Sequence, residues 1–399
     1  MKRRSSILWI LAVATALEGC GTGPAVRTGP PVFFPPLPNR PRLQFLTSYT
    51  SASDIEEHSS FEQFVVGSVD TKGGLVKPYG AAVVGMRIVV ADLGAHELMV
   101  IDLENREMRP LKGNVGGGRA KDPINVTAAA DGSVYVADGG RNQVLVFGPD
   151  ESFVAAFGTK DQFRPAAVAV AGDELFVADI AAHEIEVLDR RTGAVLRHFG
   201  GPGKDAGQLF YPTNLAVGPD GDLYVTETGN FRVQRFHPDG KSVATYGQLG
   251  DVPGTFSRPK GIGVDPQGRL YVADAAFENV QLFDSTGRLL LFFGGPGAEP
   301  GNLYLPAGMD VSTRGVEYFQ QLADPRLKLD YVVVVVSQYG PRRVNVFGFG
   351  DWTGPEVDGP PPPPDAKPET PTPTPTPTTA PAPVPAPAPA DAQPSPGGP

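Results

Sequence analysis

The sequence has one cysteine, Cys20, among its 399 residues, which excludes an intrachain disulfide and a cysteine-rich zinc site. Histidine, at 5 residues, and tryptophan, at 2, are also scarce. Lysine and arginine number 34 against 44 aspartate and glutamate residues, so the formal net charge is −10. An acidic chain lacks the basic face that nucleic-acid binding needs, and we expect no nucleic-acid partner.

Proline is abundant instead, at 43 residues, and it is concentrated in two flanks. Eighteen prolines lie in residues 360–399, and seven lie between Pro24 and Pro41. The tail alternates Thr-Pro and Ala-Pro, a composition that cannot bury a core and favours extended polyproline II. We therefore predict a proline-rich linker at 20–42, a globular body at 43–355 and a disordered tail at 356–399.

The first 19 residues have the layout of an export signal. The basic residues Lys2–Arg4 precede the apolar run Ile7–Leu17, which at about 11 residues is shorter than the roughly 20 that a membrane span needs. The ending Leu17-Glu18-Gly19-Cys20 resembles the lipobox of bacterial lipoprotein signals, although Glu18 stands where a small or apolar residue is usual. The resemblance implies a signal peptide at 1–19 and lipidation of Cys20. Ordinary cleavage nearby, leaving a free cysteine, is the alternative.

Lipidation of Cys20 would decide where the protein resides. One acyl chain binds a membrane marginally, whereas two or three anchor a protein stably. The body is acidic, so we expect attachment through lipid and not through a basic patch. The residue after Cys20 is Gly21 and not aspartate. In the proteobacterial sorting pattern, the absence of aspartate there implies the outer membrane, with the protein facing the periplasm.

A repeat fills the body of the chain. Six proline positions, which we call the anchor prolines, start similar segments at spacings of 42–47 residues: Pro78, Pro123, Pro165, Pro212, Pro259 and Pro306. Each segment has a short apolar run, a turn, a second strand ending at an acid, an alternating third strand and a fourth ending in an aromatic-Gly pair. Such short β-branched and aromatic runs predict strands. Six sets of four antiparallel strands predict an all-β, six-bladed β-propeller.

The sixth repeat is incomplete. Its third strand, Val344–Phe347, comes too close to the proline-rich tail for a full fourth strand, while Leu43–Tyr49 lies before the first repeat with no partner. We predict that Leu43–Ser48 supplies the outer strand of the last blade. The two ends of the body would then close the ring through backbone hydrogen bonds.

The segment Glu227-Thr-Gly-Asn-Phe-Arg-Val-Gln-Arg-Phe236 resembles the NHL repeat, and 138–144 and 274–280 are looser copies. The resemblance covers about residues 43–350. It implies a propeller that acts mainly as an interaction scaffold, although some relatives are enzymes. His96 and His183 occupy the histidine position of this repeat, so the resemblance explains them as repeat residues and not as metal ligands.

The acids that end the second strands invite a catalytic or metal reading: Asp92, Asp138, Asp179, Glu227 and Asp274. Because each recurs once per blade before a tight turn, we interpret them as acceptors for turn N–H groups. We predict no catalytic residue, no cofactor and no metal. Asn125 and Asn214 share a slot two residues after their anchor prolines, with no acid beside them. They support the alternative function, a metal-dependent hydrolase or lyase at the channel mouth.

The sixth repeat also carries an insertion of about 16 residues near 312–328, and Ser337 replaces the acid. The insertion is interpreted either as a surface excursion between strands or as a projecting docking element. The docking element would carry Tyr318, Phe319 and Arg326.

Loops at one end of a propeller converge around the channel mouth, where binding usually occurs. Arginine and aromatic residues anchor protein interfaces, and in these loops we select Arg141, Arg164, Tyr211, Phe231, Arg258, Lys260, Phe277 and Tyr339. The alternative is that these are scattered, solvated side chains. We predict a monomeric, non-catalytic scaffold, lipid-anchored in the cell envelope. Its partner is predicted to be an envelope protein of unknown identity, with polysaccharide as the alternative.

Overall fold

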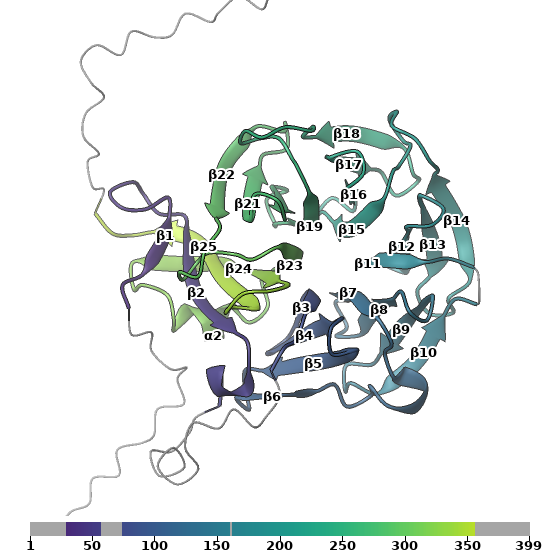
Figure 1. Ribbon diagram of the computed structural model, residues 1–399, viewed down its shortest axis with the longest axis horizontal. Helices are drawn as coiled ribbons and strands as arrows, with labels where there is room; N and C mark the ends of the chain where they lie inside the picture. The colour runs from purple at the N-terminus through teal and green to yellow at the C-terminus, as the bar shows by residue number, and fades with distance from the viewer. Residues whose placement is uncertain (1–28, 57–73, 160–161, 356–399) are drawn as a thin grey trace, which may run out of the picture. The chain divides into compact units, whose positions relative to one another are not determined.

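The computed structural model describes residues 29–56, 74–159 and 162–355 (Figure 1). Six antiparallel sheets are arranged radially around a common axis, which confirms the six-bladed β-propeller. The signal peptide, Cys20 and the tail at 356–399 lie outside the described residues. Within the described ranges, no helix is long and apolar enough to span a membrane.

Blades 1–5 each have four strands in chain order from the centre outward. Blade 1 comprises β3 (Pro78–Val84), β4 (Arg87–Asp92), β5 (Glu97–Asp102) and β6 (Glu107–Pro110). Blade 2 comprises β7 (Pro123–Ala128), β8 (Val134–Asp138), β9 (Gln143–Phe147) and β10 (Phe153–Phe157). Blade 3 comprises β11 (Pro165–Ala171), β12 (Glu174–Asp179), β13 (Glu184–Asp189) and β14 (Val195–Gly200).

The remaining elements complete the ring. Blade 4 comprises β15 (Pro212–Val217), β16 (Leu223–Glu227), β17 (Arg232–Phe236) and β18 (Ser242–Tyr246). Blade 5 comprises β19 (Pro259–Val264), β20 (Leu270–Asp274), β21 (Asn279–Phe283) and β22 (Leu289–Gly294). Blade 6 contains β23 (Pro306–Ser312), β24 (Leu327–Ser337) and β25 (Val344–Trp352). Two short 3₁₀ helices, η1 (Ala52–Asp54) and η2 (Gly116–Gly118), lie in loops.

Every inner strand begins at its anchor proline, and the register shifts directly after it. In blade 1, for example, Pro78 pairs with Asp92 and Gly80 with Ala91, so one residue is left over between them. Proline has no N–H to donate to a ladder, and a bulge accommodates this loss. The prolines therefore mark one end of the ring, at which the second strands also end. We call this end the anchor face.

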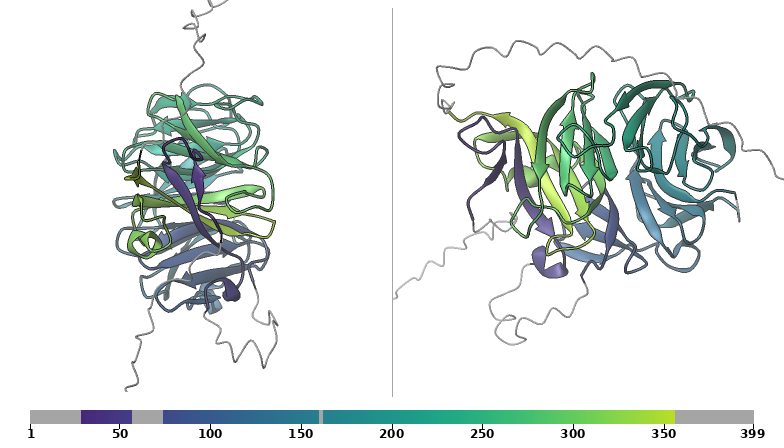
Figure 2. Two further views of the ribbon diagram at one scale, coloured as in Figure 1. Left: turned by 90° about the vertical axis from the view of Figure 1, so that its left-hand side faces the viewer. Right: turned by 45° about the horizontal axis from the view of Figure 1, so that its top comes forward.

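Blade 6 closes the ring as predicted. Strand β2 (Leu43–Tyr49) pairs with β25, from Leu43 opposite Phe349 to Tyr49 opposite Val344. A further strand, β1 (Val32–Phe34), pairs with β2, although it lies in the segment predicted as linker. Figure 2 shows both N-terminal strands beside the yellow-green strands of blade 6. The last blade therefore has five strands.

Each junction between neighbouring blades has its own apolar cluster, because both faces of a blade are buried. The junction of blades 5 and 6 contains Phe45, Phe293 and Phe347, with their rings in contact. A fully buried side chain of this kind contributes about 1.5–3 kcal/mol. The core is thus spread around the ring, and it joins every blade to the next.

The insertion in blade 6 forms helix α2 (Val316–Gln320), whose rings turn inward. Tyr318 and Phe319 are buried in the cluster between blades 6 and 1. Arg326 pairs with Asp324, and its guanidinium lies 4.7 Å from the Trp352 ring. The interpretation of a projecting docking element is therefore wrong for Tyr318 and Phe319, since burial against β24 removes their apolar surface from water.

Candidate partner-binding face

The acids at the anchor face hold its loops through backbone hydrogen bonds. Asp92 accepts N–H groups from Val76 at 2.7 Å, Lys77 at 2.9 Å, Gly94 at 3.0 Å and Ala95 at 3.1 Å. Blades 2, 3 and 5 repeat the pattern at their own acids, Asp138, Asp179 and Asp274. Carboxylates used in this way are loop acceptors, as predicted.

In blades 4 and 6 the same slot uses other partners. Glu227 accepts the Phe210 N–H at 3.0 Å and is bonded by the side chains of Asn230, Arg232 and Gln234. In blade 6, the Ser337 hydroxyl accepts the Tyr304 N–H at 3.1 Å. The slot therefore fixes the loop before the anchor proline even where its residue type changes.

The histidine slot is a left-handed turn position. Five residues, each four positions after its acid, have φ between 54° and 58°: His96, Asn142, His183, Phe231 and Glu278. His96 Nδ1 lies 2.6 Å from the Lys121 carbonyl oxygen and 2.9 Å from a carboxylate oxygen of Asp122. The Tyr211 N–H donates to His183 Nδ1 at 3.0 Å. Both histidines thus connect their blade to the next one.

At the ring centre, two side-chain contacts, Asn125–Asn214 and Lys260–Tyr79, each skip one blade. Asn125 Nδ2 donates to Asn214 Oδ1 at 3.4 Å, joining blades 2 and 4, and Asn125 Oδ1 accepts the Val168 N–H at 3.1 Å. Each amide oxygen therefore accepts one protein N–H group, while Asn214 Nδ2 is buried with no hydrogen-bond partner among the described residues. Among the described residues, no group of three or more histidine, cysteine, aspartate or glutamate side chains is arranged to hold a metal ion.

Lys260 was predicted to bind a partner, but its side chain is directed into the ring. Only 9% of the residue is exposed. Its Nζ lies 3.1 Å from the Tyr79 hydroxyl and 5.7 Å from the centre of that ring. The contact joins blades 5 and 1 across the intervening blade, so Lys260 is not available to a partner.

Asp310 and Arg314 each bond the backbone of strand β3, and neither was selected from the sequence. Asp310 stands in an inner-strand slot that holds a small residue in the other five blades, and it accepts the Val83 N–H at 2.8 Å. Arg314 donates to the carbonyl oxygens of Val83 at 3.2 Å and Ala129 at 3.0 Å. Burial raises the pKa of Asp310, while the Val83 N–H and the charge of Arg314 act in the opposite direction. In the sequence, an acid at a repeat position that otherwise holds small residues could have indicated that Asp310 has a special role.

The other selected residues do lie in the anchor-face loops, with different accessibility. Arg164, Tyr211, Arg258 and Tyr339 are exposed, whereas Phe231 and Phe277 are half-buried. Arg141 is half-buried and donates to the carbonyl oxygens of Gly117 and Arg119, both at 2.8 Å. Its guanidinium therefore holds a loop of its own chain.

Three rings gather where the loops of blades 3 and 4 meet, and we call them the aromatic cluster: His183, Phe210 and Tyr211. Their ring centres lie 4.7–5.1 Å apart. Phe210 is 39% and Tyr211 47% exposed. Phe210 was not selected from the sequence, because in the loops before the anchor prolines only the residues adjacent to each proline were considered. Exposed Leu249 and Val252 lie in the next loop along the chain.

A cleft of about 570 Å³ opens where the loops of blades 1 and 2 meet. Three cationic residues, Arg119, Lys121 and Arg141, line it, together with His96 and the two acids Glu97 and Asp122. Arg119 and Lys121 are exposed, and neither was selected from the sequence. The anchor face therefore combines an aromatic cluster with a cleft lined by charged residues of both signs.

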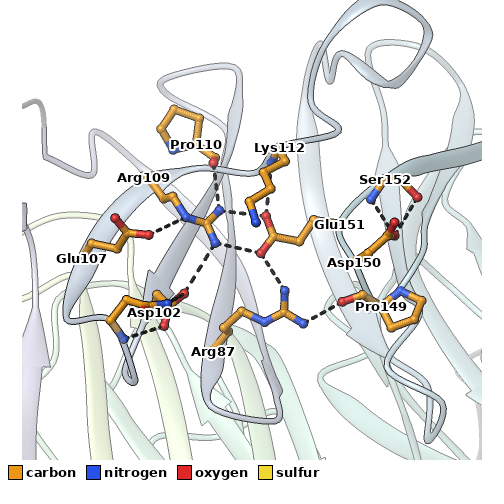
Figure 3. Close-up of polar contacts among 11 residues, drawn as sticks. Arg87, Asp102, Glu107, Arg109, Pro110, Lys112, Pro149, Asp150, Glu151 and Ser152 are labelled. Atoms are coloured by element: carbon orange, nitrogen blue, oxygen red, sulfur yellow. Dashed lines mark hydrogen bonds and ion pairs between the residues drawn. The ribbon is translucent and has the colours of Figure 1, made fainter.

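The opposite end of the ring has a buried ion-pair network between blades 1 and 2 (Figure 3). Glu151, in the turn between β9 and β10, is 3% exposed. It is bonded by Arg87 at 2.6 Å, by Arg109 at 2.7 and 2.9 Å, and by the Lys112 N–H at 3.2 Å. Burial alone would raise the pKa of Glu151, but these bonds outweigh it and lower the pKa to about 2. The network joins the two blades.

Comparisons with known proteins agree with the repeat and the fold. The model of the NHL repeat matches residues 211–236, which form the start of β15 through β17. A protein of unknown function from Bacteroides thetaiotaomicron is 15% identical, with a TM-score of 0.55, over 77% of this chain and 75% of that one. A gluconolactonase from Xanthomonas campestris is 17% identical, with a TM-score of 0.51, over 80% of this chain and 98% of that one.

A structure described as streptogramin B lyase is 14% identical, with a TM-score of 0.50, over 69% of this chain and 94% of that one. At such identities the likeness shows the fold alone. The chain is a six-bladed β-propeller in which residues 211–236 match the NHL repeat.

Proposed function

We propose that this NHL-repeat propeller is a lipid-anchored scaffold of the cell envelope that binds a protein partner through its anchor face. The observation that carries the proposal is the set of exposed rings and apolar side chains in loops at that face. Large exposed residues there are Val76, Phe210, Tyr211, Leu249, Val252 and Tyr339. Interfaces draw most of their binding energy from a few aromatic and arginine residues, and Arg164 and Arg258 are exposed in the same loops.

The polar groups at this face support binding over catalysis. The acids accept N–H groups from their own loops, and the two histidines bridge neighbouring blades. The alternative, a metal-dependent hydrolase or lyase around Asn125 and Asn214, has less support, because the described residues bring no cluster of three acids or histidines together for a metal. The likeness to a lactonase and a lyase concerns the fold and does not carry their chemistry to this chain.

Site-specific photo-crosslinking in the native envelope tests the proposed face. A benzophenone amino acid at Tyr211 or Tyr339, both exposed on the anchor face, should capture one protein of defined mass. The same group at Pro149 or Pro219, exposed in turns at the opposite end, should not. Equal capture from both ends would contradict the assignment of the face, and capture of glycan instead of protein would replace the proposed partner class.

The proposed anchor has a separate test. Radiolabelled fatty acid is expected to enter the wild-type protein and to be absent from Cys20→Ser, because Cys20 is the only cysteine in the sequence. The label is measured after removal of non-covalent lipid. Label that persists in the Cys20→Ser variant would overturn the anchor and leave the binding face untouched.

A further inference from the structure

Strand β1 fixes the point at which the chain enters the propeller. It pairs with β2 at the outer edge of blade 6. The Phe34 ring lies 5.9 Å from that of Phe293 in blade 5 and 6.1 Å from that of Phe347 in blade 6. The Phe33 ring lies 5.4 Å from that of Trp352. The chain therefore joins the ring at the rim between blades 5 and 6.

The chain between Cys20 and this rim is short. From residue 20 to residue 32 a fully extended chain covers at most about 40 Å. A body of some 300 residues is about 50 Å across. Acyl chains on Cys20 would therefore hold the rim of blades 5 and 6 near the membrane, whereas the rim of blades 2 and 3 lies beyond the reach of the tether.

The outer strands repeat one exposed apolar position. It stands three residues before the aromatic of the aromatic-Gly pair and holds Val154, Leu196, Val243 and Leu290 in blades 2–5. Each of these residues is at least 41% exposed. In blade 5 the same strand carries a second exposed apolar residue, Phe292, which is 50% exposed. Strand β22, which carries Leu290 and Phe292, contacts β1 (Figure 1), so this apolar surface lies beside the entry point of the chain.

We propose that Leu290 and Phe292 on the rim of blade 5, with Leu37 in the turn after β1, rest on the lipid surface that holds the acylated Cys20. This inference rests on the proposed lipid anchor. Leu37 is 44% exposed. A short tether holds the surface at an effective concentration on the order of millimolar, so a weak apolar contact is sufficient. Apolar contact suits a protein with a net charge of −10, which anionic lipid would repel.

The contact has a consequence for the partner. With the rim on the membrane, the axis of the ring lies along the membrane plane. The anchor face is then perpendicular to the membrane plane. Lipid does not cover it, and it stays close to the membrane surface. A partner that is itself bound to the membrane could reach it from the side.

A pair of matched labels tests this orientation. Cys20 is consumed by acylation in the lipidated protein, so Leu290→Cys and Leu196→Cys each supply one free thiol for an environment-sensitive fluorophore. Both positions occupy the same slot of the repeat, in blades 5 and 3. The lipidated proteins are reconstituted in vesicles of phosphatidylethanolamine and phosphatidylglycerol, roughly 3:1, with a spin-labelled lipid as quencher. We expect quenching at 290 to exceed that at 196 by about threefold.

Flotation of the same vesicles separates this proposal from the anchor. If the labelled protein floats with the vesicles and positions 290 and 196 are quenched equally, the rim contact is wrong and the anchor stands. If it does not float, both proposals fail. If the Leu290→Cys label is already shielded in a Cys20→Ser background without vesicles, the rim binds a second copy of the chain, which also overturns the lipid contact.

Discussion

Glu151→Gln is expected to lower the free energy of unfolding by about 3 kcal/mol at neutral pH. The substitution keeps the shape of the side chain and removes the charge that faces Arg87 and Arg109. Two guanidinium groups, each about four-fifths buried, then lose the carboxylate that compensates them. Urea unfolding at pH 7 measures the change.

The matched control is Glu174→Gln. Glu174 pairs with Arg197, but both side chains are about a third exposed, so we expect a change below about 1 kcal/mol. The pH dependence gives a second check. The pKa of Glu151 is lowered from its ordinary value near 4.5 to about 2. Its contribution is therefore complete above about pH 4.5 and is lost as the pH falls towards 2. The difference between wild type and variant should shrink over this range. A difference that stays constant would contradict the role given to the charge.

Deleting the chain through Thr50 is expected to abolish cooperative unfolding of the propeller. The deletion removes β1 and β2, and blade 6 then ends at an unpaired edge on β25. It also removes Phe45 and Leu46, which pack into the clusters on the two sides of blade 6. Thermal unfolding followed by near-ultraviolet circular dichroism measures the loss.

A point substitution keeps this prediction quantitative if the deletion does not express. Leu46→Ala is expected to cost about 2–5 kcal/mol, since Leu46 is fully buried. Val243→Ala, on the exposed face of outer strand β18, should change stability by no more than about 0.5 kcal/mol. Adding a synthetic peptide of residues 29–50 to the deleted chain should restore the folded signal. A deleted chain that unfolds like the wild type would show that the closing strands are dispensable.

The sequence predicted those features that depend on the repeat itself. Each anchor proline lacks an N–H and each acid accepts the N–H groups of a nearby loop, so their roles are local and recur in every blade. The closing strand followed from the same regularity, because Leu43–Tyr49 had no partner and the sixth repeat lacked a strand. The missing strand at the end of the repeats and the extra strand before them can both be seen in the sequence.

Contacts between blades were not visible in this way. Lys260 was selected as a surface cation, yet it reaches Tyr79 across an intervening blade. Tyr318 and Phe319 in the insertion were considered as docking residues, but an inserted helix can turn either face to the core. Phe210 stands two residues before its anchor proline, and only the path of the loop shows that its ring joins Tyr211 and His183. Such contacts depend on side-chain direction in three dimensions.

Pairing of β2 with β25 also affects the time at which the protein can finish folding. The two strands are separated by some 300 residues, which a ribosome needs about 15–60 s to synthesise. Until β25 has emerged, β2 lacks its partner in blade 6 and the ring stays open. Closure of the ring is therefore a late event in the synthesis of the chain.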